Sequence, residues 1–364
     1  MPSRTKITES VTGQPADDTS EMPPARRSRG LQGAAVRPKR MRRGRRITLI
    51  VLSALTLVVG ATAIGVGLYA RSVENGIDRV NAFDDVPEEA RPERAVADAK
   101  NLLLLGSDSR DPENTGGSRS DTIIVAHIPQ DRSSAQLISI PRDTWVSVPR
   151  SKDGRNGGRE AKINASYAWG GLPLMVQTVE QFTGVRIDHV VIIDFSGFQQ
   201  IVDVLGGVDI QVDQNFKSIH PPYRQFATGM KKMDGATALD YARQRQQFAD
   251  GDFTRIRHQQ QVIKAILDKA SSGGLLGSPT RLNGFLRATT DAVSVDETLS
   301  VFTMANELRG VRGEGLTFLT APTKGTGTVG GESVVFADPA GCKTLFDAVR
   351  RDSVKEILAT PPKK

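Results

Sequence analysis

The run NLLLL at Asn101–Leu105 is the first of four short apolar segments that decide the fold class. TIIVAHI at Thr122–Ile128, QLISI at Gln136–Ile140 and HVVII at His189–Ile193 follow it. Each segment has the length of a β-strand, and each is mainly apolar on both faces. Such strands belong to a sheet that is covered by helices on both faces.

Helical patterns lie between and after these strands. They occur at Pro173–Phe182, Phe195–Val204, Asp234–Tyr241, Thr254–Lys269, Pro279–Ala292, Val295–Leu308 and Pro339–Arg350. The combination predicts an α/β fold, a three-layer α/β/α sandwich with a central mixed sheet.

An uncharged segment, ITLIVLSALTLVVGATAIGVGLY at Ile47–Tyr69, precedes this domain. At about 1.5 Å of rise per residue it is long enough to cross a hydrocarbon core of about 30 Å. The alternatives are a cleavable signal peptide, whose apolar region usually has only about 7–15 residues, and a buried helix. Six Lys and Arg residues between Lys39 and Arg46 place the N-terminus in the cytoplasm by the positive-inside rule. We expect a single-pass cell-membrane protein with one transmembrane helix at residues 47–70 and an extracytoplasmic folded domain.

The net charge of +7 is concentrated at the N-terminus. Residues 1–46 hold twelve Lys and Arg against four Asp and Glu, which leaves 36 basic and 37 acidic residues elsewhere. Because the basic excess is not on the folded domain, nucleic acid is not expected as a partner. The sequence predicts a disordered basic cytoplasmic tail at 1–46, an extracytoplasmic stalk at 71–97, the catalytic domain at 98–355 and a flexible C-terminus at 356–364.

Outside the membrane no ready supply of nucleoside triphosphate or reduced dinucleotide exists, so the chemistry must use preactivated substrates. GTGTVG at Gly325–Gly330 matches the dinucleotide fingerprint G-x-G-x-x-G only formally. An expected strand, Glu332–Ala337, follows it where the fingerprint requires a helix. We interpret the segment as a flexible hairpin connection.

The segment ARQRQQFADGDFTRIRHQQQ at Ala242–Gln261 concentrates arginine. The planar guanidinium group of Arg can donate two parallel N–H hydrogen bonds to one phosphate, so the segment suggests a phosphate-binding site. Arg243 and Arg245 point the same way only on extended chain, which requires the preceding helix to end near Tyr241.

Further along the same segment, Arg255 and Gln259 are four residues apart and share one face of a predicted helix. Arg257 lies round the helix and is expected either to face solvent or to support the site without touching the ligand. Asp252 is expected to cap the N-terminus of this helix.

Two acidic residues stand at strand ends. Asp108 in GSDSR follows the first strand, and Asp121 in GGSRSD begins the second. Ligands of open α/β sheets collect at such ends, and paired carboxylates favour Mg²⁺ shared with substrate phosphates. The alternative, that Asp108 bonds backbone amides in a turn and Asp121 pairs with Arg119, stays open.

Six motifs in this order resemble the LytR-CpsA-Psr family over residues 98–270, with a weaker match to about residue 355. They are GSDSR, RSDT, IPRDTWV, KINASYAWGG, FSGFQQIVDVLGGVDI and ALDYARQRQQFADGDFTRIRHQQQ. Members of this family are single-pass membrane proteins with the layered fold described above. His258 stands where members often have Arg, which puts a charge role at this position in doubt.

The resemblance implies a Mg²⁺-dependent phosphotransferase that needs no nucleotide. It would move a glycan phosphate from a polyprenyl-pyrophosphate carrier to a sugar hydroxyl of peptidoglycan, beside the lipid bilayer. The implied metal ligands are Asp108 and Asp121. The implied catalytic residues are Asp108, Asp121, Arg142, Arg243 and Arg245. The implied pyrophosphate ligands are Arg119, Arg142, Lys162, Arg243, Arg245, Arg255 and Gln259.

A polyprenyl carrier also needs an apolar groove. Apolar helix faces that we expect to line it contain Leu174, Val179, Phe182, Phe198, Ile201, Val202 and Leu205, although core packing explains most of them equally well. The arginine-rich composition is typical of actinobacteria, which favours arabinogalactan as the glycopolymer. A hydrolase of the same lipid pyrophosphate and a membrane-tethered wall-binding or regulatory protein are the alternative functions.

Overall fold

The computed structural model describes residues 71–359, except for residues 73, 108–119, 249, 272–277, 309–310 and 312–314. Within these residues no helix combines the length and the apolar character that a membrane span requires. The tail expected at 1–46 and the span expected at 47–70 lie outside the described residues.

A mixed sheet of seven strands forms the centre of the described part of the chain, in the order β1-β12-β7-β2-β3-β4-β13. The strands are β1 (Asp78–Val80), β2 (Lys100–Ser107), β3 (Ser120–Ile128), β4 (Ala135–Ser139), β7 (His189–Asp194), β12 (Val293–Asp296) and β13 (Leu316–Thr320). The four apolar runs form β2, β3, β4 and β7, as predicted. β2 is parallel to β7 and antiparallel to β3, which makes the sheet mixed.

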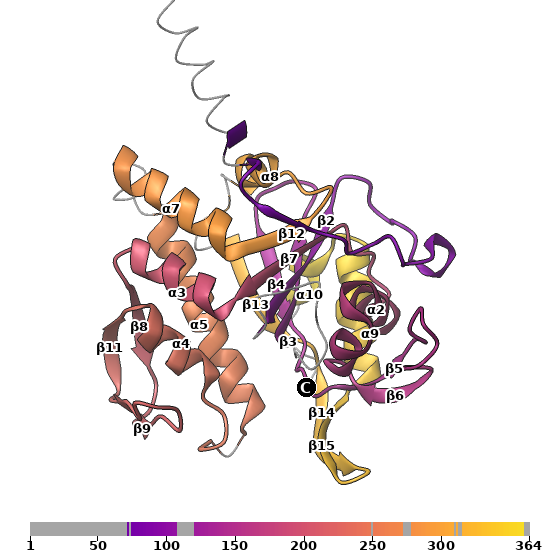
Figure 1. Ribbon diagram of the computed structural model, residues 1–364. Coiled ribbons are helices and arrows are strands. Elements are labelled where there is room, and N and C mark those ends of the chain that lie inside the picture. Colours follow the sequence, from indigo (N-terminus) through magenta and orange to yellow (C-terminus); the bar gives the residue numbers. More distant parts are fainter. Residues whose placement is uncertain are drawn as a thin grey trace, which may run out of the picture. The chain divides into compact units, whose positions relative to one another are not determined.

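Helices cover both faces of the sheet (Figure 1). One face carries α2 (Ala165–Thr183), α9 (Pro339–Arg350) and α10 (Val354–Ala359). The other carries α3 (Phe195–Val204), α5 (Asp252–Ser271), α7 (Pro279–Ala292) and α8 (Val301–Glu307), with α4 (Gly235–Arg243) packed against α3 and α5. On β2, Leu103 and Leu105 enter the core under α2 and α9, whereas Leu102 and Leu104 enter the core under α5. The predicted three-layer sandwich is confirmed.

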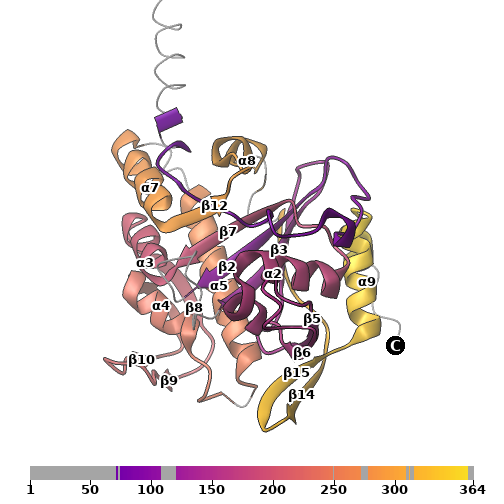
Figure 2. The same ribbon diagram turned by 45° about the vertical axis from the view of Figure 1, so that its right-hand side comes forward.

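Short hairpins extend from these layers. β5 (Trp145–Val148) pairs with β6 (Arg159–Lys162), and β14 (Thr323–Val329) pairs with β15 (Glu332–Ala337). The two hairpins lie next to each other in both views, and a bridge between Thr144 and Val335 joins them (Figures 1 and 2). β8 (Val208–Val212) with β11 (Gly229–Met233), and β9 (Phe216–Lys217) with β10 (Gln225–Phe226), pack near α4. A short 3-10 helix, η1 (Glu88–Ala90), precedes β2.

Local capping explains several helix starts. The Asp194 carboxylate accepts from the Gly197 amide at the start of α3, and Asp234 accepts from the Thr237 amide at the start of α4. Each satisfies a backbone donor that the first helical turn leaves unpaired. The bounds predicted for the helices that form α3, α7 and α9 are confirmed to the residue.

The helix predicted at Val295–Leu308 is wrong in its first half. Val293–Asp296 is strand β12, which pairs antiparallel with β7, and only Val301–Glu307 is helical. The β-branched residues Val293 and Val295 alternate with polar ones, which suits a strand. The segment 325–330 also differs from the expected flexible connection, because most of it belongs to β14 and the turn falls at Gly330 and Gly331.

The stalk expected at 71–97 is also wrong in part. β1 lies within this range and pairs in parallel with β12 at the edge of the sheet. Ile77, Val80 and Val86 are buried, and Arg79 donates to the Asp296 carbonyl at 3.0 Å. The segment therefore belongs to the folded domain.

Helix α2 begins eight residues before the predicted start at Pro173. Its first turn is separated from the rest by a kink, where Gly170 and Gly171 leave helical geometry and Gly171 has φ 63°. Gly supplies this left-handed conformation without the steric cost of a Cβ atom. Pro173 then falls in the first turn of the second part, where its missing N–H breaks no helical bond.

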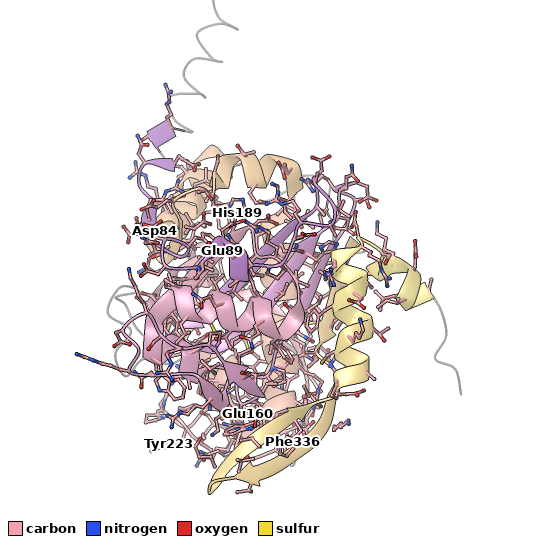
Figure 3. All side chains as sticks on the ribbon, turned by 90° about the vertical axis from the view of Figure 1, so that its right-hand side faces the viewer. Asp84, Glu89, Glu160, His189, Tyr223 and Phe336 are labelled. Carbon is pink, nitrogen blue, oxygen red and sulfur yellow. The ribbon has the colours of Figure 1, made fainter. Side chains whose placement is uncertain are left out.

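Asp296 ends β12 and is almost completely buried. It accepts from the Val190 amide at 3.0 Å and the Thr298 amide at 2.9 Å, and His189 Nδ1 lies 3.2 Å away (Figure 3 labels His189). Burial by itself would raise the pKa of Asp296, but hydrogen bonds from His189, Thr298 and Val190 hold it below its ordinary value.

We expect Asp296→Asn to lower the free energy of unfolding at neutral pH by about 1–3 kcal/mol, because amide donors of β7 lose a charged acceptor. The folded-state pKa is depressed, so the contribution of the carboxylate is complete above its unfolded pKa of about 3.9 and is lost as the pH falls. The difference in free energy of unfolding between the wild type and the variant, measured by urea denaturation, should therefore become smaller between about pH 5 and about pH 3. A difference that stays constant over this range would contradict the assignment.

Candidate functional site

Segments far apart in the sequence meet where β2, β4 and β7 end. β3 contributes Asp121, and the segment after β4 contributes Arg142. Arg243 ends α4, Arg245 lies in the segment between α4 and α5, and Arg255 belongs to α5. Arg142 donates through Nη1 to Asp121 Oδ1. We call Arg142, Arg243, Arg245 and Arg255 the arginine cluster. The carboxyl ends of strands are where open α/β sheets bind ligands.

The end of α4 brings two of these arginines to the same side. Arg243 is the last residue of the helix, and Gln244 is extended with φ −67° and ψ 133°. The fully buried Gln244 side chain fixes this bend by donating to the Asp240 carbonyl at 2.9 Å. Arg243 and Arg245 therefore reach the same cavity, although the helix ends at Arg243, two residues beyond the predicted end at Tyr241.

A chain of alternating charges holds the cluster in place. Asp143 Oδ2 accepts from Arg245 Nη2 at 2.7 Å, Arg245 Nε lies 3.4 Å from Asp252 Oδ1, and Asp252 Oδ1 lies 2.5 Å from Arg255 Nη2. Asp143, Asp252 and Arg255 are each 5% exposed or less. Asp252 was predicted to cap the N-terminus of this helix. It is the first residue of α5, and it also pairs with two arginines, which was not predicted.

Burial shifts the ionisation of this chain. It raises the pKa of Asp252 against the opposing charges of Arg255 and Arg245. It lowers the pKa of Arg255 to about 10, so this guanidinium is still charged at neutral pH. Within the described part of the chain, the buried Nε atoms of Arg142 and Arg255 have no hydrogen-bond acceptor. Because buried donors are normally satisfied, these two are suited to an anionic ligand.

A cavity of about 890 Å³ extends from the arginine cluster between the sheet and the helices α3, α5 and α7. Its walls are almost entirely aliphatic or aromatic, as shown by Leu104, Ile124, Leu137, Phe198, Ile263 and Phe285. The charged and amide groups that line it include Asp121, Gln259 and the arginine cluster. The cavity therefore suits a ligand with a long apolar part and an anionic head.

Our expectation for the apolar groove was partly wrong. Phe198 and Ile201 on α3 line the cavity, but Leu174, Val179 and Phe182 on α2 pack on the opposite face of the sheet. Of the remaining expected residues, Val202 is buried against β8, and Leu205 caps α3. Helical periodicity identifies an apolar face, but it does not specify which side of the sheet that face covers.

A second hollow, which we call the polar recess, lies on the other side of Arg142 and Arg245 and has a volume of about 630 Å³. The β5–β6 hairpin, the first turn of α2 and the tip of the β14–β15 hairpin form its walls. Lys162 lies here, 3.8 Å from Asp143 Oδ1 and 3.2 Å from Glu332 Oε2. The predicted pyrophosphate ligand Lys162 thus faces the recess, whereas Gln259 faces the apolar cavity.

The remaining predicted residues either lie outside the described residues or do not line the cavity. Asp108 and Arg119 lie outside the described residues. Arg257 is exposed and pairs with Asp250 at 2.8 Å, as expected for a residue facing solvent. His258 is fully buried and stacks on Tyr241 at a ring-centroid distance of 4.0 Å. Burial lowers the pKa of His258, which agrees with the doubt about a charge role at this position.

Asp143 was not among the site residues predicted from the sequence. Asp143 is buried and bonds to Arg245, which is 102 residues away in the chain. The sequence carried only one signal, the position of Asp143 directly after Arg142 at a strand end. Phe195 was also missed, although its ring lies 4.6 Å from the Arg243 guanidinium carbon.

Comparison with known proteins gives related sequences over most of the chain. The "Probable cell wall biosynthesis protein LcpB" of Corynebacterium glutamicum is 33% identical over 334 residues, covering 85% of this chain and 74% of that protein. The "Polyisoprenyl-teichoic acid--peptidoglycan teichoic acid transferase TagU" of Halalkalibacterium halodurans is 34% identical over 257 residues, covering 68% of this chain and 79% of that protein.

Solved structures and a family model agree with these relatives. The crystal structure of B. subtilis TagV superposes with a TM-score of 0.57 at 27% identity, covering 73% of this chain and all of that one. The LytR-Csp2A-Psr enzyme from Actinomyces oris superposes with a TM-score of 0.57 at 18% identity, covering 75% of this chain and 95% of that one, and shows the fold alone. The model of the LytR_cpsA_psr family matches residues 69–350. The chain therefore belongs to the LytR_cpsA_psr family.

Proposed function

We propose that this protein is a phosphotransferase that moves a glycan phosphate from a polyprenyl-pyrophosphate carrier to a sugar hydroxyl of peptidoglycan. Such a reaction attaches a glycopolymer to the cell wall. Family membership supports it, as do relatives named as cell wall biosynthesis proteins and as teichoic acid transferases.

One observation carries the proposal: an apolar cavity of about 890 Å³ ends on four arginines. A polyprenyl pyrophosphate has the same two parts, an apolar chain and a doubly charged head. Burying apolar chain contributes about 0.8 kcal/mol per CH₂ group, so the cavity would supply much of the affinity. The arginines would neutralise the phosphates and fix their position, which are the main demands of phosphoryl transfer.

The proposed reaction balances without an added energy source. The acceptor oxygen forms a bond to the glycan-linked phosphorus, and the bond from that phosphorus to the bridging oxygen breaks. Polyprenyl phosphate leaves with the bond electrons, and the arginine cluster stabilises the negative charge that develops on it. In this proposal Asp108 takes the proton of the hydroxyl group.

Mg²⁺ belongs to the proposal, with Asp121 and Asp108 as its protein ligands. Asp121 is a half-buried carboxylate that lines the phosphate end of the cavity, so its chemistry fits a hard cation. Among the described residues no three His, Cys, Asp or Glu side chains gather as a complete protein cage for a metal. Mg²⁺ does not need one, because it commonly uses one or two carboxylates together with waters and substrate phosphates. When bound, it would add positive charge beside the phosphate oxygens.

We further propose a cell-membrane location, with the helix at residues 47–70 as anchor and the domain on the outer side. The distribution of Lys and Arg before this segment supports that orientation. We also propose arabinogalactan as the glycopolymer, on the basis of the arginine-rich composition and the relative from C. glutamicum.

The arginine cluster can be tested with substitutions of exposed or half-buried members. We expect Arg243→Gln and Arg245→Gln to lower the rate of glycan transfer by about 100-fold or more, because each removes a donor at the site of developing charge. Arg257→Gln is the matched control, since Arg257 lies on the exposed side of α5 and pairs with Asp250. The assay would follow labelled glycan from polyprenyl pyrophosphate into peptidoglycan.

Two outcomes of this assay would count against the proposal. Full transfer by both Arg243→Gln and Arg245→Gln would remove the arginine cluster from the reaction. Release of free glycan phosphate by the wild-type protein in the presence of peptidoglycan, without transfer, would instead identify a hydrolase.

The apolar cavity can be tested by filling it. Ile263→Trp on α5 places a bulky ring inside the cavity, whereas Lys264→Trp adds the same ring on the exposed side of the helix. We expect Ile263→Trp to weaken binding of a long polyprenyl phosphate by about tenfold or more, because several methylene groups lose their burial. Binding of a short-chain isoprenyl phosphate should change much less, and Lys264→Trp should bind both as the wild type does. Equal losses for the long and the short lipid would show that the cavity does not hold the chain.

A further inference from the structure

The polar recess shares Arg142 and Arg245 with the apolar cavity but opens away from it. The cavity lies between the sheet and α5, whereas the recess is bounded by α2 and the two hairpins. A phosphorus atom held by these two arginines would therefore face apolar chain on one side and a polar hollow on the other.

Aromatic rings line part of the recess. The chain contains two tryptophans, Trp145 and Trp169, and both lie here. Trp145 Nε1 donates to Glu160 Oε2 at 3.2 Å, and the Arg159 guanidinium carbon lies 4.8 Å from the centroid of the Trp169 ring. Both rings are only half-buried, so each keeps apolar surface that a ligand can cover.

The kink in α2 puts Trp169 in this position. Trp169 is the last residue before Gly170 and Gly171, where the helical path breaks. A Cβ atom on Gly170 would lie 2.7 Å from Leu174 Cβ, so the close approach of the two parts of α2 requires glycine. Two alanines in the same first turn, Ala165 and Ala168, also line the recess and leave space beside the ring.

Hydrogen-bonding groups surround these rings. Glu160 lines the recess, and its carboxylate accepts from Trp145 Nε1. Lys162 and Glu332 form an ion pair at 3.2 Å, and the Glu332 side chain is 65% exposed. Donors, acceptors and aromatic faces occur together, which is the combination that a sugar needs: its hydroxyl groups bond to polar groups and its C–H face packs on a ring.

We propose that the polar recess binds the acceptor, a pyranose of the peptidoglycan glycan strand, with its ring against Trp145 or Trp169. This inference rests on the proposed function. Transfer requires the attacking and leaving oxygens to lie roughly in line through phosphorus. Because the polyprenyl phosphate leaves towards the apolar cavity, the attacking hydroxyl must approach from the opposite side, where the recess opens beside Arg142 and Arg245.

The two tryptophans permit a direct test on the full-length wild-type chain in detergent. Soluble oligosaccharides from undecorated peptidoglycan should change the tryptophan fluorescence in a saturable way, because the only two indole rings of the chain line the recess. The absence of a saturable change at oligosaccharide concentrations up to about 10 mM, weaker than any useful acceptor affinity, would overturn the proposal. The titration needs no catalysis, so it still tests the recess if the proposed transfer reaction fails.

The kinetics of transfer show whether the recess binds the acceptor or the glycan part of the donor. We expect Trp169→Ala to raise KM for peptidoglycan oligosaccharide about tenfold, while Kd for polyprenyl phosphate and KM for the donor stay within about twofold. Tyr223→Ala is the matched control, because Tyr223 is an exposed aromatic residue outside the recess (Figure 3). A rise in the KM for the donor alone would show that the recess holds the donor glycan and would refute the assignment. Trp169→Phe keeps an aromatic ring and should restore most of the acceptor affinity. A residue that only supported folding would change the KM for the donor together with the KM for the acceptor.

Discussion

The site depends on one constraint, the need to hold several guanidinium groups together against their mutual repulsion. Two like charges about 4 Å apart repel by about 4 kcal/mol at the effective dielectric constant of a protein surface. Asp143 and Asp252 offset this repulsion by alternating with the half-buried Arg245 and the buried Arg255 in one chain of charges. Loss of one partner from such a buried pair typically costs about 3–5 kcal/mol, so the chain fixes the arginines in position. Within the described residues, the buried Nε atoms of Arg142 and Arg255 have no hydrogen-bond acceptor. The carboxylates therefore do not satisfy all the guanidinium donors, and those that are left can bind an anion.

The position of this cluster divides the domain into two chemical environments. One side of the sheet offers aliphatic walls, and the other offers tryptophan, carboxylate and ammonium groups. A reaction between a lipid-linked donor and a wall polysaccharide needs both environments to meet at one phosphorus atom. The sheet supplies the barrier between them, because its strands are buried on both faces and only their ends are open to ligands.

Sequence patterns predicted the elements best where local signals were strong. The apolar runs of β2, β3, β4 and β7 were correctly predicted as strands, and the helices α3, α7 and α9 were placed to the residue. The errors fall where the local signal is ambiguous. Val293–Asp296 is short enough to fit either a strand or a helix, and β1 has only three residues and no apolar run. β1 forms the edge of the sheet by pairing with β12, and β12 pairs with both β1 and β7, so both strands depend on contacts made only in the folded sheet.

The sequence by itself determined the family, the layered architecture and the arginines of the Ala242–Gln261 segment, because motifs and periodicity are properties of the linear chain. Only the tertiary structure decided which side of the sheet each helix covers, and therefore that α3 and α5, and not α2, enclose the apolar cavity. It also decided that Asp143 bonds to an arginine 102 residues away and that Trp145 and Trp169 line one recess. The physical reason is the same in each case: contacts between distant segments arise from packing the whole core, and no local pattern in the sequence encodes them.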